Sequence, residues 1–396
     1  LLNILSKDFE SKILVELEPS FLQKIINEIE LKIIYKAINE LDSDDAALII
    51  SSLDNEKKKL VLSKISRKER TFIEDNLSYD KNTAGRLMQL ELVRIPVHFN
   101  VGDVIDYLRK KRTLPKVFYD LYIVEKNQKL VGTIELSNII SSSRNVKISN
   151  IMKKSELSVH SSLDQEDVAD IFRKRNLTSI AVIDDNRKLL GTINVDDIVD
   201  VIDDEAQEDI LKLAGVGEQD FYGAVISITK ARFAWLFFNL IAAFFASYVI
   251  KNFEGTIEKL AILAALMPIV ASMGGCSGTQ SLTTAVRAIA MKQLTWSNAL
   301  RSMGKEVSVG MINGVIFSAA SFFLTYYWFQ ELLLSFVISF SLFLNLIFGS
   351  FFGIFIPIFL TKKGVDPAIA SGTFVTMFTD IVGFFMFLSL ATIFLI

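Results

Sequence analysis

Five long apolar segments in the C-terminal part of the chain constrain its fold more than any other feature. They cover about 233–250, 261–287, 307–329, 332–360 and 372–396. A helix needs roughly 20 apolar residues to cross a hydrocarbon layer of about 30 Å. Lipid offers no hydrogen bonds, so a spanning segment must satisfy its own backbone. The sequence therefore predicts a transmembrane domain of five helices over residues 232–396.

Basic residues near the ends of these segments predict their orientation. By the positive-inside rule, the side of the membrane with more lysines and arginines is the cytoplasmic side. One side carries Lys230, Arg232, Arg287, Lys292, Arg301, Lys305, Lys362 and Lys363, and the other carries Lys251 and Lys259. We therefore expect a multi-pass protein of the cell (inner) membrane, with a cytoplasmic N-terminal part and an outside C-terminus.

The second apolar segment is unusual because it is rich in small and polar residues. It reads MPIVASMGGCSGTQSLTTAVRAIA over residues 267–290. Pro268 and the glycines are expected to break or bend a helix here. Two interpretations remain open. The small residues form a seam for close helix packing, or the segment lines an ion path, where polar backbone can face water instead of lipid.

Asp380 is an acid inside the last apolar segment, GTFVTMFTDIVGFFMFL. A charged side chain at the bilayer centre costs about 2.5–3.5 kcal/mol on insertion scales, so such residues usually serve function. Thr373, Thr376 and Thr379 could add neutral oxygens beside it. Asp380 therefore favours the interpretation of these segments as the lining of an ion path.

The N-terminal part, residues 1–231, has a different composition, rich in Lys, Asp and Glu. Apolar residues recur at helical spacing over residues 1–78, which predicts a helical solenoid domain within residues 1–92. No basic face indicates a nucleic-acid partner. Cys276 is the only cysteine, so the chain cannot form an internal disulfide. His98 and His160 lie far from it in sequence, which argues against a zinc site. No phosphate-binding GxxxxGK[ST] motif occurs, and we expect no enzyme activity.

Residues 93–200 contain an internal repeat. YDLYIVEKNQKLVGTIELSNII (119–140) and SIAVIDDNRKLLGTINVDDIV (179–199) align at one offset of 59 residues, as with Gly132 and Gly191. Each copy reads as strand, strand and helix, and the pair resembles a tandem pair of α/β CBS domains. That resemblance implies a regulatory module, which in some members binds adenosine nucleotides. The second copy keeps part of the ribose-binding pattern in Gly191, Asn194 and Asp197. ATP binding at Asp197 and a nucleotide-free module are both open.

An acidic run follows the repeat and opens a linker segment, residues 201–231. On a helix its acids fall at i,i+4 spacing, where like charges repel. A solvated acidic face is one interpretation, and a divalent-cation site is the other, since clustered carboxylates suit hard cations. The candidate ligands are Asp196, Asp197, Asp200, Asp203, Asp204, Glu205, Glu208 and Asp209.

These motifs in this order resemble the MgtE family of magnesium channels and transporters. The resemblance rests on MPIVASMGGCSGTQ, SGTFVTMFTDIVGFFMFLSLATIFL, YDKNTAGRLM and VDDIVDVIDDEAQEDILKLAGV. It implies a homodimer in the lipid membrane, with its pore on the two-fold axis, Asp380 at the central pore site, and closure by cytosolic Mg²⁺ bound among the N, CBS and linker ("plug") regions. The expected pore-lining residues are Gly274, Gly275, Cys276, Gly278, Thr279, Thr376, Thr379 and Gly383.

Two departures from the family pattern bear on function. Cys276 stands where the family usually has Asn, and its soft sulfur suits transition metals better than Mg²⁺. Lys81 and Asn82 stand where family members often carry acids. Fewer acids there imply fewer regulatory ions on the N domain. Cys276 either alters ion selectivity or only fills space near the pore. The alternatives to a Mg²⁺ channel are a CBS-regulated transporter of Co²⁺ or another divalent metal, and a membrane sensor that transports nothing.

Overall fold

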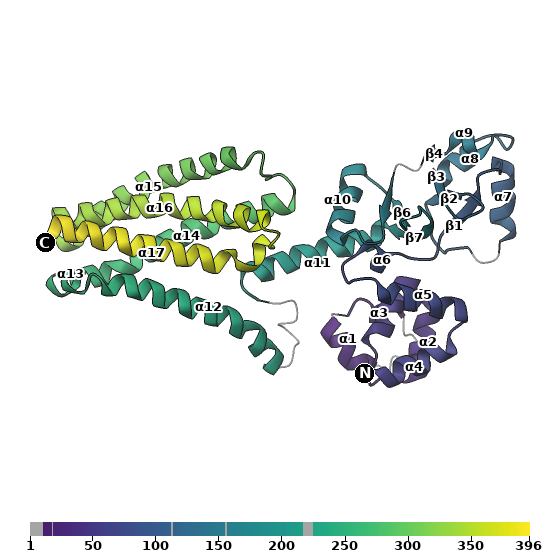
Figure 1. The fold of residues 1–396 in the computed structure, drawn as a ribbon, viewed down its shortest axis with the longest axis horizontal. Helices are drawn as coiled ribbons and strands as arrows, with labels where there is room; N and C mark the ends of the chain where they lie inside the picture. Colours follow the sequence, from purple (N-terminus) through teal and green to yellow (C-terminus); the bar gives the residue numbers. More distant parts are fainter. Residues whose placement is uncertain (1–10, 18, 112–113, 155–156, 217–224) are drawn as a thin grey trace. The chain divides into compact units, whose positions relative to one another are not determined.

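The structure is a computed structural model that describes residues 11–17, 19–111, 114–154, 157–216 and 225–396. The chain forms two compact units, Leu1–Ala206 and Gln207–Ile396. The linker predicted over residues 201–231 includes 217–224, which lie outside the described residues. Figure 1 labels the elements of both units.

The first unit begins with a domain of short helices. They are η1 (Ser11–Leu14), α1 (Pro19–Ile26), α2 (Leu31–Glu40), α3 (Ser43–Ser52), α4 (Asn55–Lys64), α5 (Arg67–Ser78) and α6 (Ala84–Leu87). Helical spacing of apolar residues buries one stripe of each helix, as with Ile34 on α2 and Ile49 on α3. Asp54 is the N-cap of α4, where its side chain accepts a hydrogen bond from the Lys57 backbone amide.

The repeat in the sequence is also a repeat in the structure. The first copy has β1 (Val93–Pro96), α7 (Val101–Lys110), β2 (Asp120–Val124), β3 (Leu130–Glu135) and α8 (Leu136–Ser141), followed by α9 (Ile148–Ile151) and β4 (Lys153–Lys154). The second has β5 (Ser158–His160), α10 (Gln165–Arg175), β6 (Ser179–Ile183), β7 (Leu189–Asn194) and α11 (Val195–Leu213). In both sheets a parallel pair is followed by an antiparallel pair, in the orders β1-β2-β3-β4 and β5-β6-β7.

Tyr122 of β2 joins the two copies of the repeat. Its hydroxyl lies 2.7 Å from Ser179 Oγ and 2.5 Å from Thr192 Oγ1, both in the second copy. Burial raises the pKa of this phenol well above its usual range, against the lowering effect of these two hydrogen bonds. A buried tyrosine whose hydroxyl is satisfied in this way holds the two sheets in one register.

The second unit contains the five helices long and apolar enough to cross a membrane, as the sequence predicts. They are α12 (Val225–Lys251), α14 (Ile262–Ala290), α15 (Ala299–Phe329), α16 (Leu332–Lys362) and α17 (Pro367–Leu395), with the short α13 (Glu254–Lys259) after α12. Two begin eight residues before the predicted apolar limits, α12 at Val225 and α15 at Ala299. Hydropathy detects only the lipid-depth part of a helix, whereas the helix itself continues into polar surroundings.

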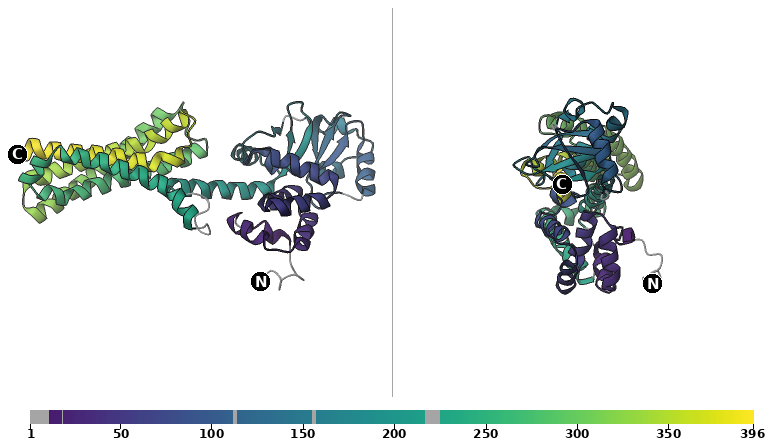
Figure 2. Two further views of the ribbon diagram at one scale, coloured as in Figure 1. Left: turned by 60° about the horizontal axis from the view of Figure 1, so that its bottom comes forward. Right: turned by 90° about the vertical axis from the view of Figure 1, so that its right-hand side faces the viewer.

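Helix α16 is the centre of this bundle. It contacts α14, α15 and α17, which run lengthwise beside it in Figures 1 and 2. In the most apolar 18-residue stretch of α16, 56% is buried inside the protein, whereas the corresponding share is 11% in α12 and in α15. Helix α14 is continuous from Ile262 to Ala290, so Pro268 and the glycines do not break it. One proline removes a single backbone donor, and packing on α16 stabilises the glycine-rich turns.

Candidate ion path and acidic cluster

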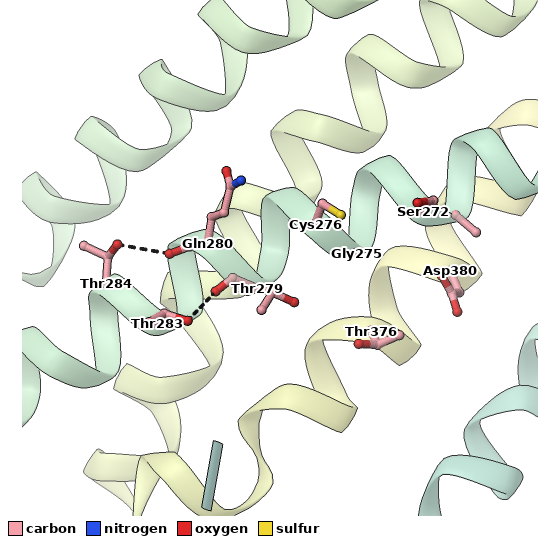
Figure 3. A pocket seen from close by; sticks show the side chains of 10 residues that line it. Ser272, Gly275, Cys276, Thr279, Gln280, Thr283, Thr284, Thr376 and Asp380 are labelled. Carbon is pink, nitrogen blue, oxygen red and sulfur yellow. Dashed lines mark hydrogen bonds between the residues drawn. The ribbon is translucent and has the colours of Figure 1, made fainter. Parts of the chain in front are cut away.

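An open cleft of about 870 Å³ lies between α14 and α17 (Figure 3). Helix α14 contributes one long face of small and hydroxyl-bearing residues, and α17 contributes two polar side chains one turn apart. The lining residues are Ala271, Ser272, Gly275, Cys276, Thr279, Gln280, Thr283, Thr284, Thr376 and Asp380. Asp380 is the only ionisable carboxylate in this lining, so it dominates the charge of the cleft.

The Asp380 carboxylate is half-buried, and no hydrogen bond or ion pair from a described residue reaches it. Three threonine hydroxyls of the cleft lining are held differently. Thr283, Thr284 and Thr376 each donate to a carbonyl of their own helix, at 2.9, 3.0 and 3.1 Å. Since each hydroxyl hydrogen is engaged, the oxygens remain as acceptors. Acceptors and a carboxylate suit the water molecules of a hydrated cation, because those waters donate hydrogen bonds.

The opposite face of α14 packs against α16. An added Cβ at Gly349 would lie 2.7 Å from the Gly274 carbonyl oxygen, and one at Gly353 would lie 2.4 Å from the Gly278 carbonyl oxygen. These helices cross at two small-xxx-small pairs, which lets their backbones approach closely. The packing seam is therefore confirmed for one face of α14, and the opposite face lines the open cleft.

Four residues expected to line the pore do not line the cleft. Gly274 and Gly278 lie on the packing face of α14. Thr379 is fully buried and donates to the Thr376 carbonyl at 3.0 Å, while Gly383 packs on Asn345 of α16. Helical periodicity separates these residues from Gly275, Cys276, Thr279 and Thr376, which do line it.

Within the described part of one chain, the acids of α11 do not form a ligand group by themselves. Among the described residues no group of three or more Asp, Glu, His or Cys side chains is placed to hold a metal ion. The eight acids are spread along a single helix, α11. Glu205 accepts from Gln165 Nε2 at 2.6 Å, and Glu208 pairs with Lys212. Asp196, Asp203 and Asp204 are exposed, as expected for a solvated face.

Asp197 is the member of the run that turns inward. It accepts from Gln89 Nε2 at 2.9 Å and from the Asn194 amide at 3.3 Å. Burial raises its pKa to about 7, and the charges of Asp196 and Asp45 add to that rise. Asp197 occupies the position of the ribose-binding acid in the nucleotide pattern. With its carboxylate engaged and other acids near it, the residues present do not fit a bound ATP at this position.

The structure brings acids of α3 toward this end of α11, which the sequence did not reveal. Burial and the neighbouring Asp197 raise the pKa of Asp44 well above its usual range, and its Oδ1 atom is buried with no partner among the described residues. Burial and Asp42 raise the pKa of Asp45 to about 6, and Asp200 adds to it. In the sequence, LDSDDAALII resembles an ordinary acidic helix start, so nothing there distinguished these carboxylates.

Comparisons with known proteins cover both units. Residues 267–390 match the MgtE family described as "Divalent cation transporter", residues 1–82 match the MgtE intracellular N domain, and residues 148–204 match the CBS domain. The chain is 32% identical over 323 residues to the magnesium transporter MgtE of Enterococcus faecalis, covering 82% of this chain and 71% of that protein.

The corresponding protein of Bacillus subtilis is 30% identical over 320 residues, covering 81% of this chain and 71% of its own length. A crystal structure of the cytosolic domain of the Mg²⁺ channel MgtE in complex with ATP aligns with 48% of this chain and 78% of its own, at 24% identity and a TM-score of 0.46. Sequence similarity over four fifths of the chain places it firmly: this protein belongs to the MgtE family of magnesium transporters.

Proposed function

We propose that the protein is a channel through which Mg²⁺ crosses the cell membrane down its electrochemical gradient, passing Asp380. The observation that carries this proposal is an unpaired carboxylate at membrane depth, in a cleft whose neighbouring hydroxyls act as acceptors. A carboxylate left without a partner in lipid is costly unless a cation or water meets it. An inside-negative potential favours inward movement of a dication by about 4.6 kcal/mol per 100 mV, twice the value for one charge.

The working unit is a homodimer. One chain supplies one open wall of the path, so a second copy is needed to enclose it. Two apolar side chains at equivalent positions of the repeat support pairing. Ile140 on α8 is 74% exposed and Val199 on α11 is 53% exposed, 59 residues apart. Exposed apolar residues related by the internal symmetry of the repeat suit an isologous contact with a second copy.

Cytosolic Mg²⁺ closes the channel by drawing together acids of α3 and α11, which in the described part of the chain are not placed as a ligand set of three or more. The support is the group of like charges formed by Asp44, Asp45 and Asp197, where burial raises the pKa of each carboxyl and neighbouring carboxylates raise it further. A divalent cation relieves that repulsion and so favours the state in which these acids are close. The ion shifts the population toward that state, and sufficient internal Mg²⁺ stops import.

A second function is favoured by one specific residue. The Cys276 side chain is exposed in the cleft lining, where it offers a soft sulfur ligand. Such a ligand suits Co²⁺ or another transition metal better than Mg²⁺. A transporter of those ions would use the same cleft, with Asp380 and Cys276 acting together.

Ion flux into proteoliposomes tests these proposals. Purified protein is reconstituted, and uptake of Mg²⁺ and of Co²⁺ is followed with indicators inside the vesicles. Asp380→Asn should reduce Mg²⁺ uptake at least tenfold. The control Glu331→Gln removes an exposed acid that makes no side-chain cap bond at the start of α16 and should leave uptake unchanged. Wild-type uptake by a folded Asp380→Asn protein would overturn the path, and uptake of Co²⁺ alone would favour the second function.

A further inference from the structure

Asn345 is a fully buried amide in α16, the central helix of the membrane unit. Its Nδ2 donates to the Val270 carbonyl of α14 at 2.8 Å. Its Oδ1 is also buried, and no group in the described part of the chain donates to it. The side chain therefore has one directional bond, which joins α16 to the helix that forms most of the cleft wall.

The same amide packs on glycines of both cleft-lining helices. A Cβ added at Gly274 of α14 would lie 2.1 Å from Asn345 Nδ2, and one added at Gly383 of α17 would lie 2.6 Å from it. Gly274 immediately precedes Gly275, and Gly383 follows Asp380 by three residues. The contacts made by Asn345 thus lie directly behind the cleft face of each helix.

We infer that Asn345 is a positioning residue for ion passage: its amide sets the register of α14 and α17 on α16, and so the separation of Gly275 and Cys276 from Asp380 across the cleft. The inference rests on the proposed function for its transport consequence. A hydrogen bond to one carbonyl specifies both the axial position and the rotation of α14, whereas apolar packing permits sliding.

The buried Oδ1 atom of Asn345, which has no partner among the described residues, indicates that the side chain does more than fill space. A leucine would fill a similar volume without burying an unsatisfied acceptor, and burying such an atom is unfavourable. If packing were the only requirement, an apolar residue would serve better at this position. An amide is useful here because its donor is directional, and that direction is toward α14.

The only cysteine of the chain supplies a direct measurement of cleft geometry. Cys276 is exposed in the cleft, so its rate of reaction with a small methanethiosulfonate reagent reports the local opening and does not require transport. The reaction is measured in reconstituted protein carrying Asn345→Leu, which keeps side-chain volume but removes the donor. Mg²⁺ uptake is measured on the same vesicles.

Ser341→Ala is the matched control. Ser341 is equally buried on α16, one turn before Asn345, but its hydroxyl donates to the Val337 carbonyl of its own helix at 2.7 Å. Asn345→Leu should change the Cys276 reaction rate at least fivefold and lower Mg²⁺ uptake, and Ser341→Ala should change neither. If Asn345→Leu does not yield monodisperse protein, Asn345→Ala removes the donor without added bulk and is measured instead.

Two results would overturn the inference: a wild-type Cys276 reaction rate in the folded variant, or an altered rate with wild-type uptake and wild-type ion preference. Failure of the proposed function is distinguishable from both. It would appear as absent uptake in the unaltered protein, and the reaction rate of Cys276 alone would then decide whether Asn345 positions the two helices.

Discussion

Lys212 Nζ lies 2.9 Å from Asp366 Oδ2, which ties the end of α11 to the start of α17. The other oxygen of Asp366 caps α17 by accepting from the Ala368 amide at 2.8 Å. Burial lowers the pKa of Lys212, but its bonds to Glu208 and Asp366 outweigh this effect and raise that pKa above its usual range. One carboxylate therefore both begins the helix that carries Asp380 and holds the linker helix against it.

Two variants of Asp366 should separate these roles. Asp366→Asn keeps a good helix cap but removes the charge, whereas Asp366→Ala removes both. We expect Asp366→Ala to lower the free energy of unfolding by about 1 kcal/mol more than Asp366→Asn. Both should increase protease cleavage near residues 207–216, since the ion pair is lost in each. Equal stability of the two variants would show that the cap contributes nothing.

Cys276 should report on the ion path directly. A small thiol reagent should block uptake by the unaltered protein and leave Cys276→Ala unaffected, because the chain has no other cysteine. Cys276→Asn replaces a soft sulfur with a hard oxygen and should raise the preference for Mg²⁺ over Co²⁺. If neither the reagent nor the substitution alters conduction or ion preference, the side chain only fills space.

Neutralising the acids between α3 and α11 should weaken inhibition by internal Mg²⁺. The double variant Asp45→Asn/Asp197→Asn removes two of the charges that a cation would neutralise. We expect the inhibitory Mg²⁺ concentration to rise about tenfold, equivalent to roughly 1.4 kcal/mol of binding energy. Asp203→Asn, which removes an exposed acid of the same helix, should leave it unchanged. Unchanged inhibition in the double variant would place the sensor elsewhere.

The same acids should make stability depend on pH. The folded-state pKa values of Asp45 and Asp197, about 6 and about 7, lie above the ordinary value of 3.8. The folded state therefore binds more protons than the unfolded state between these values, and stability falls as pH rises through that window. Without divalent cations, the unfolding midpoint should drop by a few degrees from pH 5 to pH 8, as followed by thermal denaturation.

Two controls apply to this pH dependence. Asp45→Asn/Asp197→Asn should show a flatter profile over the same range, since amides do not titrate there. Added Mg²⁺ should restore the midpoint at pH 8 more than at pH 5, because protons and the cation compete for the same carboxylates. A midpoint that rises with pH in cation-free buffer would contradict the predicted direction.

The crossing of α14 and α16 predicts unequal effects of two glycine substitutions. A Cβ at Gly353 would lie 2.4 Å from the Gly278 carbonyl oxygen, which is backbone and cannot move aside, whereas a Cβ at Gly275 would meet nothing within 4 Å. Gly353→Ala should cost about 1–3 kcal/mol through overpacking. Gly275→Ala should keep stability and alter only uptake. Size-exclusion profiles and unfolding midpoints in detergent would show the difference, and equal midpoints would refute the close crossing.

Local and periodic features could be predicted from the sequence. Hydropathy located the five membrane helices, and a constant offset identified the repeat whose two copies share sheet topology. Both depend on residues near one another in the chain, or on matched positions. The family resemblance, confirmed by relatives that align over four fifths of the chain, rests on motifs of the same local kind.

Only the tertiary structure shows which face of α14 packs against α16 and which face lines the cleft. Periodicity shows that Gly275 and Gly278 lie on different faces of a helix, but not which face another helix covers. Asn345 packs on Gly274 from 71 residues farther along the chain, and Asp197 lies near Asp44 across more than 150 residues. Contacts between distant segments depend on how helices pack. The spacing of small residues predicts a packing face, but it does not say which helix packs there.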